Sequence, residues 1–153
     1  MSRHVLMIVA PFYKHITDQL IAGASAELAK DDITFDLVEV PGAMEIPAIV
    51  HLAETSYKND PHEAKYYDGF VALGCVIRGE TSHYDYVAGE CCRALMDLTL
   101  QGLAIGNGVL TVENEEQALV RSDPSKKNKG AAAAEACMAV MSVRSQLRGG
   151  INQ

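Results

Sequence analysis

Residues 69–85 read GFVALGCVIRGETSHYD, and this stretch decides the fold of the 153-residue chain. Residues 69–76 form a continuous apolar run, which is typical of a strand buried on both faces of a parallel sheet. The residues that follow carry two hydroxyls, a cation and His83, and they lead into a helical pattern. Parallel sheets bind ligands at the carboxyl ends of their strands, and helix N-termini attract anions. We therefore expect an anion site here, with His83 as its acid–base group.

Three further runs of apolar residues predict strands at residues 5–10, 35–40 and 103–105, the last of which can continue through residues 108–110. The alternating pattern of residues 35–40 indicates a half-exposed edge strand. Between the strands, apolar stripes at helical spacing predict three helices. The stripes consist of Ile16, Leu20, Ile21, Ala24 and Leu28, then Ile46, Ile49, Val50 and Ala53, then Val87, Cys91, Leu95 and Leu98.

Two more helices are predicted near the C-terminus. Thr111 is the expected N-cap of a short helix whose first turn is rich in glutamate, and a longer helix spans about residues 130–147. The longer helix is apolar around most of its circumference, which suits burial against another subunit or tight packing within one chain. Alternation of strands and helices predicts an α/β fold with a four-stranded parallel sheet and helices on both faces, in one domain spanning residues 1–153.

Composition narrows the class of protein. The net charge of −7 argues against a nucleic-acid coat, and no apolar run approaches the length of a membrane span. The first apolar run is too short for a secretion signal, and the four cysteines form no C-x-x-C pair, so we expect reduced thiols in a cytoplasmic protein. A basic cluster suits either a small anionic substrate or a solvated turn; it consists of Arg121, Lys126, Lys127 and Lys129.

Two segments offer binding groups, while several well-known nucleotide and metal motifs are absent. In residues 40–47, VPGAMEIP, Pro41 should end a strand, Gly42 should allow a sharp turn, and Glu45 can bind a polyol or simply complement a helix dipole. Thr81 or Ser82 can cap the helix that follows, and Ser82 and Asp85 fit a capping box. The sequence contains no G-x-G-x-x-G, no G-x-x-x-x-G-K-[ST] and no H-E-x-x-H, so a dinucleotide, a nucleoside triphosphate or a metal ion is not expected.

Four segments together resemble the lumazine synthase family: residues 40–47, residues 73–87, residues 108–118 with Arg121, and residues 128–130. The resemblance implies a flavodoxin-like three-layer sandwich and a transferase of riboflavin biosynthesis. Such an enzyme condenses 5-amino-6-(D-ribitylamino)uracil with 3,4-dihydroxy-2-butanone 4-phosphate to 6,7-dimethyl-8-ribityllumazine, phosphate and water. It implies no metal or redox cofactor, and a homopentamer whose sites lie between neighbouring subunits.

The resemblance also assigns roles to residues. His83 matches the proton-transfer histidine, Arg121 matches the arginine that holds the phosphate, and Phe12 matches the aromatic residue that stacks on the pyrimidine. Three further groups match substrate contacts: Glu80 and Thr81 for the butanone phosphate, Ala43, Met44 and Glu45 for the ribityl chain, and Cys75, Val76 and Ile77 for the pyrimidine.

The chain departs from the family pattern at three places. Asn107 occupies a position where many members carry a second aromatic residue facing the ring, Pro11 and Tyr13 flank Phe12 in place of Arg and Asn, and residues 122–127 form a proline-containing turn. A stiffer turn aims the last helix differently, so we expect a free pentamer rather than the larger closed shell of some members.

Two other functions stay open on the sequence. One is a pentameric protein of this fold that binds lumazine or flavin with little or no turnover. Asn107, at the position expected to be aromatic, is the feature that leaves this alternative open. The other is a flavodoxin-like electron carrier, although the hydroxyl-rich phosphate loop expected after Ala10 is missing.

Overall fold

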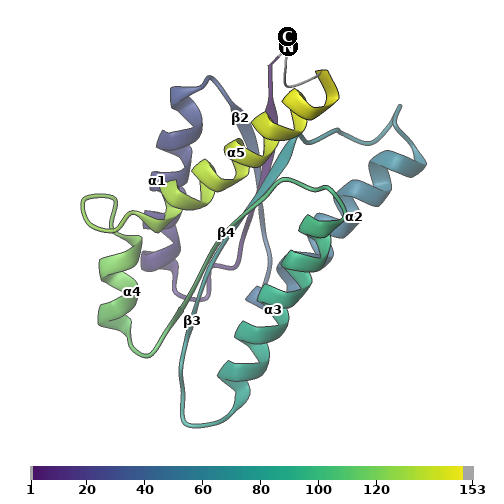
Figure 1. Cartoon of the computed structure of the whole chain (residues 1–153). Coiled ribbons are helices and arrows are strands. Elements are labelled where there is room, and N and C mark those ends of the chain that lie inside the picture. The colour runs from purple at the N-terminus through teal and green to yellow at the C-terminus, as the bar shows by residue number, and fades with distance from the viewer. Residues whose placement is uncertain (1, 150–153) are drawn as a thin grey trace.

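The structure, a computed structural model that describes residues 2–149, is built on one four-stranded parallel sheet in the order β2-β1-β3-β4 (Figure 1). The strands are β1 (His4–Val9), β2 (Thr34–Glu39), β3 (Gly69–Ile77) and β4 (Ile105–Val112). β2 lies at one edge of the sheet and is only partly buried, which confirms the edge strand predicted from its alternating sequence.

Helices cover both faces of this sheet (Figure 1). α1 (Lys14–Lys30), α4 (Glu115–Ser122) and α5 (Lys129–Gly149) pack on one face. The short 3₁₀ helix η1 (Ala43–Glu45), α2 (Ile46–Asn59) and α3 (His83–Leu100) pack on the other. The predicted three-layer α/β fold is therefore confirmed.

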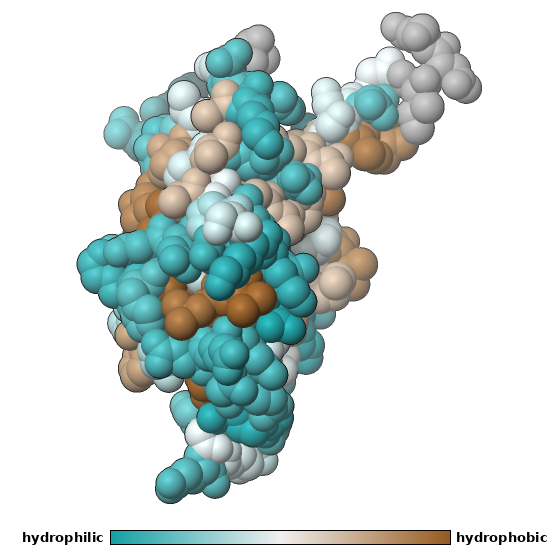
Figure 2. All heavy atoms as spheres, turned by 90° about the vertical axis from the view of Figure 1, so that its left-hand side faces the viewer, coloured by the Kyte–Doolittle hydropathy of each residue, from teal (hydrophilic) through white to brown (hydrophobic). Residues whose placement is uncertain are grey.

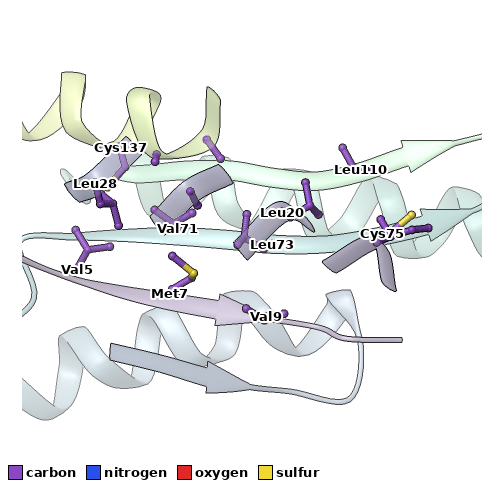
Figure 3. Close-up of a cluster of buried hydrophobic side chains, with 14 of the residues drawn as sticks. Val5, Met7, Val9, Leu20, Leu28, Val71, Leu73, Cys75, Leu110 and Cys137 are labelled. Carbon is purple, nitrogen blue, oxygen red and sulfur yellow. The ribbon is translucent and has the colours of Figure 1, made fainter. Parts of the chain in front are cut away.

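The two faces of the sheet build two separate hydrophobic clusters. In β1, Val5, Met7 and Val9 point toward α1 and α5 (Figure 3), whereas Leu6 and Ile8 point toward α2 and α3. Successive side chains of a strand alternate between faces, so a strand that is covered on both sides must be apolar throughout. That requirement explains the unbroken apolar runs of β1 and β3.

Glycines let α5 lie close to its neighbours. A Cβ on Gly130 would come within 3.0 Å of the Leu20 backbone in α1, and one on Gly106 in β4 would meet the Ala133 backbone in α5. The contact thus joins backbone to backbone, which only glycine allows at these positions. α5 is fixed against α1 and β4 by this close approach.

The region around β4 corrects two predictions. The strand begins at Ile105 rather than at residue 103, and it continues through Thr111 to Val112. Thr111 is therefore not a helix cap. The N-cap of α4 is Asn114, whose side-chain Oδ1 accepts a hydrogen bond of 2.9 Å from the Gln117 backbone N–H. The hydroxyl of Thr111 favoured a helix cap, but the strand continues past this residue to Val112.

The outer surface is mixed in polarity. The face that carries α1 and α4 is largely hydrophilic, with apolar groups gathered in smaller patches (Figure 2). On α5, one side is buried while Val140, Val143 and Leu147 remain exposed. Within residues 2–149, no helix has both the length and the apolar composition to span a bilayer.

Candidate active site

A cavity of about 420 Å³ lies at the carboxyl ends of β1, β2 and β3. This edge of a parallel sheet is where the sequence predicted ligand binding. Its lining includes many of the predicted site residues, which come from four separate segments: Phe12, Ala43, Met44, Glu45, Cys75, Val76, Ile77 and His83.

The segment between β1 and α1 supplies an exposed aromatic ring. Phe12 is 75% exposed and meets Tyr13 edge to face, with ring centroids 4.9 Å apart. The Tyr13 backbone carbonyl accepts hydrogen bonds from the first turn of α1, and its ring packs on the core, so Tyr13 holds the base of this aromatic pair. Phe12 is left free to lie on a planar ligand.

The turn between β2 and α2 forms the opposite wall. Ala43 is buried, whereas the side chains of Met44 and Glu45 are exposed at the start of α2. The chain bends at Gly42, as expected, and the Gly42 carbonyl oxygen accepts from the Glu45 N–H at 3.2 Å. The glycine itself has extended backbone, with φ −150° and ψ 173°, so the bend needs no left-handed conformation. A Cβ at this position would lie 3.1 Å from Oε2 of the exposed Glu45 side chain, so a small shift of that carboxylate would make room for it.

The end of β3 forms the floor of the cavity. Cys75 is buried, and Val76 and Ile77 are half-buried. Burial, assisted by the charge of Glu115, raises the pKa of the Cys75 thiol to about 11. The thiol is therefore neutral at physiological pH and contributes an apolar contact rather than a nucleophile.

His83 is the first residue of α3, and its side chain reaches the cavity. Its backbone N–H donates to Thr81 Oγ1 at 3.3 Å. The predicted capping box is wrong, because the Ser82 side chain makes no capping bond and the Asp85 carboxylate instead pairs with Arg78. Val87, which the sequence analysis did not assign to the site, also lines the cavity; its spacing of four residues from His83 on one helix could have revealed it.

Two predicted site residues lie elsewhere, in a second depression of about 310 Å³ beside β4. Arg121 lines it from α4, and Arg121 Nη1 donates to the Gln117 carbonyl oxygen at 3.1 Å. Asn107 lines it from β4, where its Oδ1 accepts from the Val109 N–H at 3.0 Å. Lys129 also lines this depression; it was predicted as part of the basic cluster but not as a site residue.

Glu80 and Thr81 line neither depression. Both lie exposed in the loop between β3 and α3, next to His83. One chain therefore presents the predicted residues in two groups with no shared lining residue: one around His83 and one around Arg121.

The chemistry available at the main cavity is proton transfer and positioning. Within the described residues, no group of three or more His, Cys, Asp and Glu side chains is arranged to hold a metal ion. An exposed aromatic ring, a buried neutral thiol and a histidine suit a flat heterocycle that exchanges protons.

Comparisons with known proteins agree with this geometry. The sequence model of the family described as 6,7-dimethyl-8-ribityllumazine synthase matches residues 2–145. A 6,7-dimethyl-8-ribityllumazine synthase of Paramagnetospirillum magneticum is 52% identical over 144 residues, which cover 94% of this chain and 95% of that protein. One from Bartonella bacilliformis is 51% identical over 142 residues, covering 92% and 90%. On these grounds the chain belongs to the 6,7-dimethyl-8-ribityllumazine synthase family.

Proposed function

We propose that the protein condenses 5-amino-6-(D-ribitylamino)uracil with 3,4-dihydroxy-2-butanone 4-phosphate, giving 6,7-dimethyl-8-ribityllumazine, phosphate and two molecules of water. The observation that carries the proposal is the cavity that gathers His83, Phe12, the turn before α2 and the end of β3, in a chain of this family. A binding protein without turnover is not favoured, because close relatives over most of the chain are named as synthases.

The proposed reaction needs proton transfers but no net oxidation or reduction. The 5-amino group attacks the ketone, and the carbinolamine loses water to form an imine. Phosphate then leaves by elimination, and attack of the ribityl-bearing nitrogen on the new carbonyl closes the ring with loss of the second water. Histidine is suited to such transfers near neutral pH, so we assign them to His83.

The binding residues that we propose lie at the two depressions and in the loop between β3 and α3. We assign Phe12 to stacking on the pyrimidine, residues 75–77 to its edge, and residues 43–45 to the ribityl chain. We assign the phosphate to Arg121, because a guanidinium binds phosphate oxygens bidentately. We assign Glu80 and Thr81, in the loop that precedes His83, to the same substrate. Holding two substrates in reacting geometry is the larger contribution, worth roughly 7–11 kcal/mol at best.

The separation of these groups supports an assembly in which neighbouring copies complete each site. We propose a homopentamer in which the His83 cavity of one copy meets the Arg121 depression of the next. The exposed Val140, Val143 and Leu147 of α5 offer apolar surface for such contacts. We propose that this pentamer does not assemble further into a larger closed shell, because the proline-containing turn at residues 122–127 is stiff. Asp123 holds the turn, since its Oδ1 accepts hydrogen bonds from the Ser125 N–H and hydroxyl.

Two further proposals concern the whole chain. We propose that it forms one domain, since the family match spans residues 2–145; Met1 and residues 150–153 lie outside the described part. We also propose a cytoplasmic location, as expected for an enzyme whose four cysteines are free thiols.

Turnover is the first test. Purified protein is mixed with both substrates, and lumazine is followed by its absorbance and fluorescence against a protein-free control. Product formed well above the uncatalysed condensation supports the enzyme. If folded protein binds lumazine but does not accelerate the condensation above background, the proposed enzyme activity is wrong and the binding function takes its place.

A further inference from the structure

Arg78 occupies the junction between the sheet and the start of α3. It directly follows β3, and its backbone N–H donates to the Val112 carbonyl oxygen at 2.9 Å, so the backbone is still tied to β4 at this residue. The next residues, Gly79 to Ser82, form the loop that leads to His83. The Arg78 side chain is therefore attached to rigid sheet backbone at the point where the chain leaves it.

The guanidinium of Arg78 is held on three sides. Nη1 lies 3.1 Å from Asp85 Oδ1, and Nε lies 2.9 Å from Glu113 Oε2. Its Cζ lies 4.2 Å from the centre of the Tyr84 ring. A planar fork can satisfy two carboxylates while stacking on an aromatic face, whereas a lysine ammonium cannot do all three.

Two of these partners belong to the helix that carries His83. Tyr84 and Asp85 follow His83 directly in the first turn of α3. Ser82 makes no side-chain capping bond, but the Thr81 hydroxyl accepts from the His83 backbone N–H at 3.3 Å. The contacts of Arg78 with Tyr84 and Asp85 add to this bond in orienting the first turn. A shift of the first turn would move the His83 imidazole with it.

The third partner extends the network to the second depression. Glu113 follows β4, and its backbone N–H donates to Gln117 Oε1 at 2.8 Å. The Gln117 carbonyl oxygen accepts from Arg121 Nη1 at 3.1 Å. A chain of ion pairs and hydrogen bonds thus connects Arg78 both to the first turn of α3, which carries His83, and to Arg121.

We propose that Arg78 is a positioning residue for the reaction: it sets the first turn of α3 against β4 and thereby fixes His83. This inference rests on the proposed function. Arg78 and its two carboxylate partners are exposed to solvent by 38% and 59% respectively, and ion pairs of that kind add little to folding stability. Loss of the Arg78 side chain should therefore leave the fold intact and change only the position of the first turn of α3 and of His83.

The test compares Arg78→Ala and Arg78→Lys with a matched control, Arg93→Ala. Arg93 also bridges two carboxylates, Glu90 and Asp97, but Arg93 and both of its partners are residues of α3 itself. We expect Arg78→Ala to lower kcat about 10- to 100-fold with KM for the uracil changed less than about 3-fold, because misplacement affects the chemical step most. Arg78→Lys should recover only part of kcat, and Arg93→Ala should resemble the parent.

A second readout does not need turnover. The His83 imidazole resonance, identified by its loss in His83→Gln, should shift in Arg78→Ala and stay in place in Arg93→Ala. If the parent protein lacks turnover, the proposed function fails while the resonance still tests the positioning. Should Arg78→Ala not fold, Asp85→Asn and Glu113→Gln each remove one ion-pair partner of Arg78. Each single variant should lower kcat, and the double variant should lose less than the product of the two single losses. Parent-like kcat and an unshifted His83 resonance in Arg78→Ala, or in both single variants, would overturn the inference.

Discussion

Arg121 and its surroundings determine what a single substitution in the second depression should do. Among residues 2–149, its guanidinium donates one hydrogen bond, to the Gln117 carbonyl oxygen, and the other N–H groups can face a phosphate. Arg121→Ala should raise KM for the butanone phosphate about 10- to 100-fold, as expected for loss of a hydrogen bond to a charged group. Steady-state kinetics with each substrate varied in turn measures this. Lys126→Ala removes a charge from the nearby exposed turn and should leave that KM unchanged. Equal effects of both variants would mean that Arg121 attracts the phosphate only through its charge and does not bind it directly.

Asn107 stands where the sequence resemblance to the family leads us to expect an aromatic residue. Its amide is already engaged, since Oδ1 accepts from the Val109 N–H and Nδ2 lies 3.4 Å from Cys92 Sγ. Asn107→Phe should lower KM for the uracil about 3- to 10-fold, because an aromatic pair contributes roughly 0.5–1.5 kcal/mol. Titration of the protein with lumazine, followed by fluorescence, checks the same contact without turnover. Weaker binding in Asn107→Phe would mean that the amide itself contacts the ligand.

At the scale of elements, the docking of α5 depends on glycine. Gly130→Ala would place a methyl group against the Leu20 backbone, so α5 must move away from α1. We expect a loss of about 1–3 kcal/mol in the free energy of unfolding, as for other overpacked cores. Gly89→Ala is the matched control within a helix, because a Cβ there meets nothing within 4 Å. It should instead stabilise by about 0.5–1 kcal/mol. Denaturant unfolding of the two variants and the parent distinguishes these signs.

Elements with strong patterns were predictable from the sequence, and their junctions were not. The continuous runs of β1 and β3 follow from burial on both faces, which leaves no room for polar residues. The end of β4 was missed because Thr111 suits both a strand and a cap, and pairing with β3 decides between them. The capping box at Ser82 failed for a related reason: Arg78 and Glu113 lie 35 residues apart, and no local pattern reveals that Asp85 joins them.

The same limit applies to the site. The residues around His83 gather because consecutive strands of a parallel sheet end at one edge, which the order of elements already implies. Arg121 and Asn107 were assigned by resemblance alone, and their separation from His83 depends on how α4 and β4 pack. Tyr13 and Val87 were not assigned because their roles come from neighbours in space rather than from a motif.

At the scale of the whole molecule, a carboxylate at the opposite end of the sheet predicts how stability depends on pH. Hydrogen bonds from Lys65, Tyr67 and His4 lower the pKa of Asp36 below its ordinary 3.8. The stabilisation is therefore fully present well above pH 3.8 and is lost as the pH falls toward the lower pKa of the folded state. Asp36→Asn should be less stable than the parent at pH 7, and the difference should shrink on acidification. Thermal unfolding from pH 7 to pH 3 measures it, with Asp18→Asn, which breaks an exposed pair within α1, as a control with little effect.

Assembly gives the most discriminating prediction, because one chain holds its His83 and Arg121 groups in separate depressions. His83→Ala and Arg121→Ala should each lose activity alone, the first moderately since substrate positioning survives. If each site combines His83 of one copy with Arg121 of its neighbour, refolding the two variants together in equal amounts should create intact sites. Random mixing in a ring makes about one interface in four intact, so activity should rise toward about a quarter of the parent. A site within one chain would give no recovery, because every copy would still carry one lesion. Mass measurement of the mixed assembly separates that outcome from a failure of the variants to assemble together.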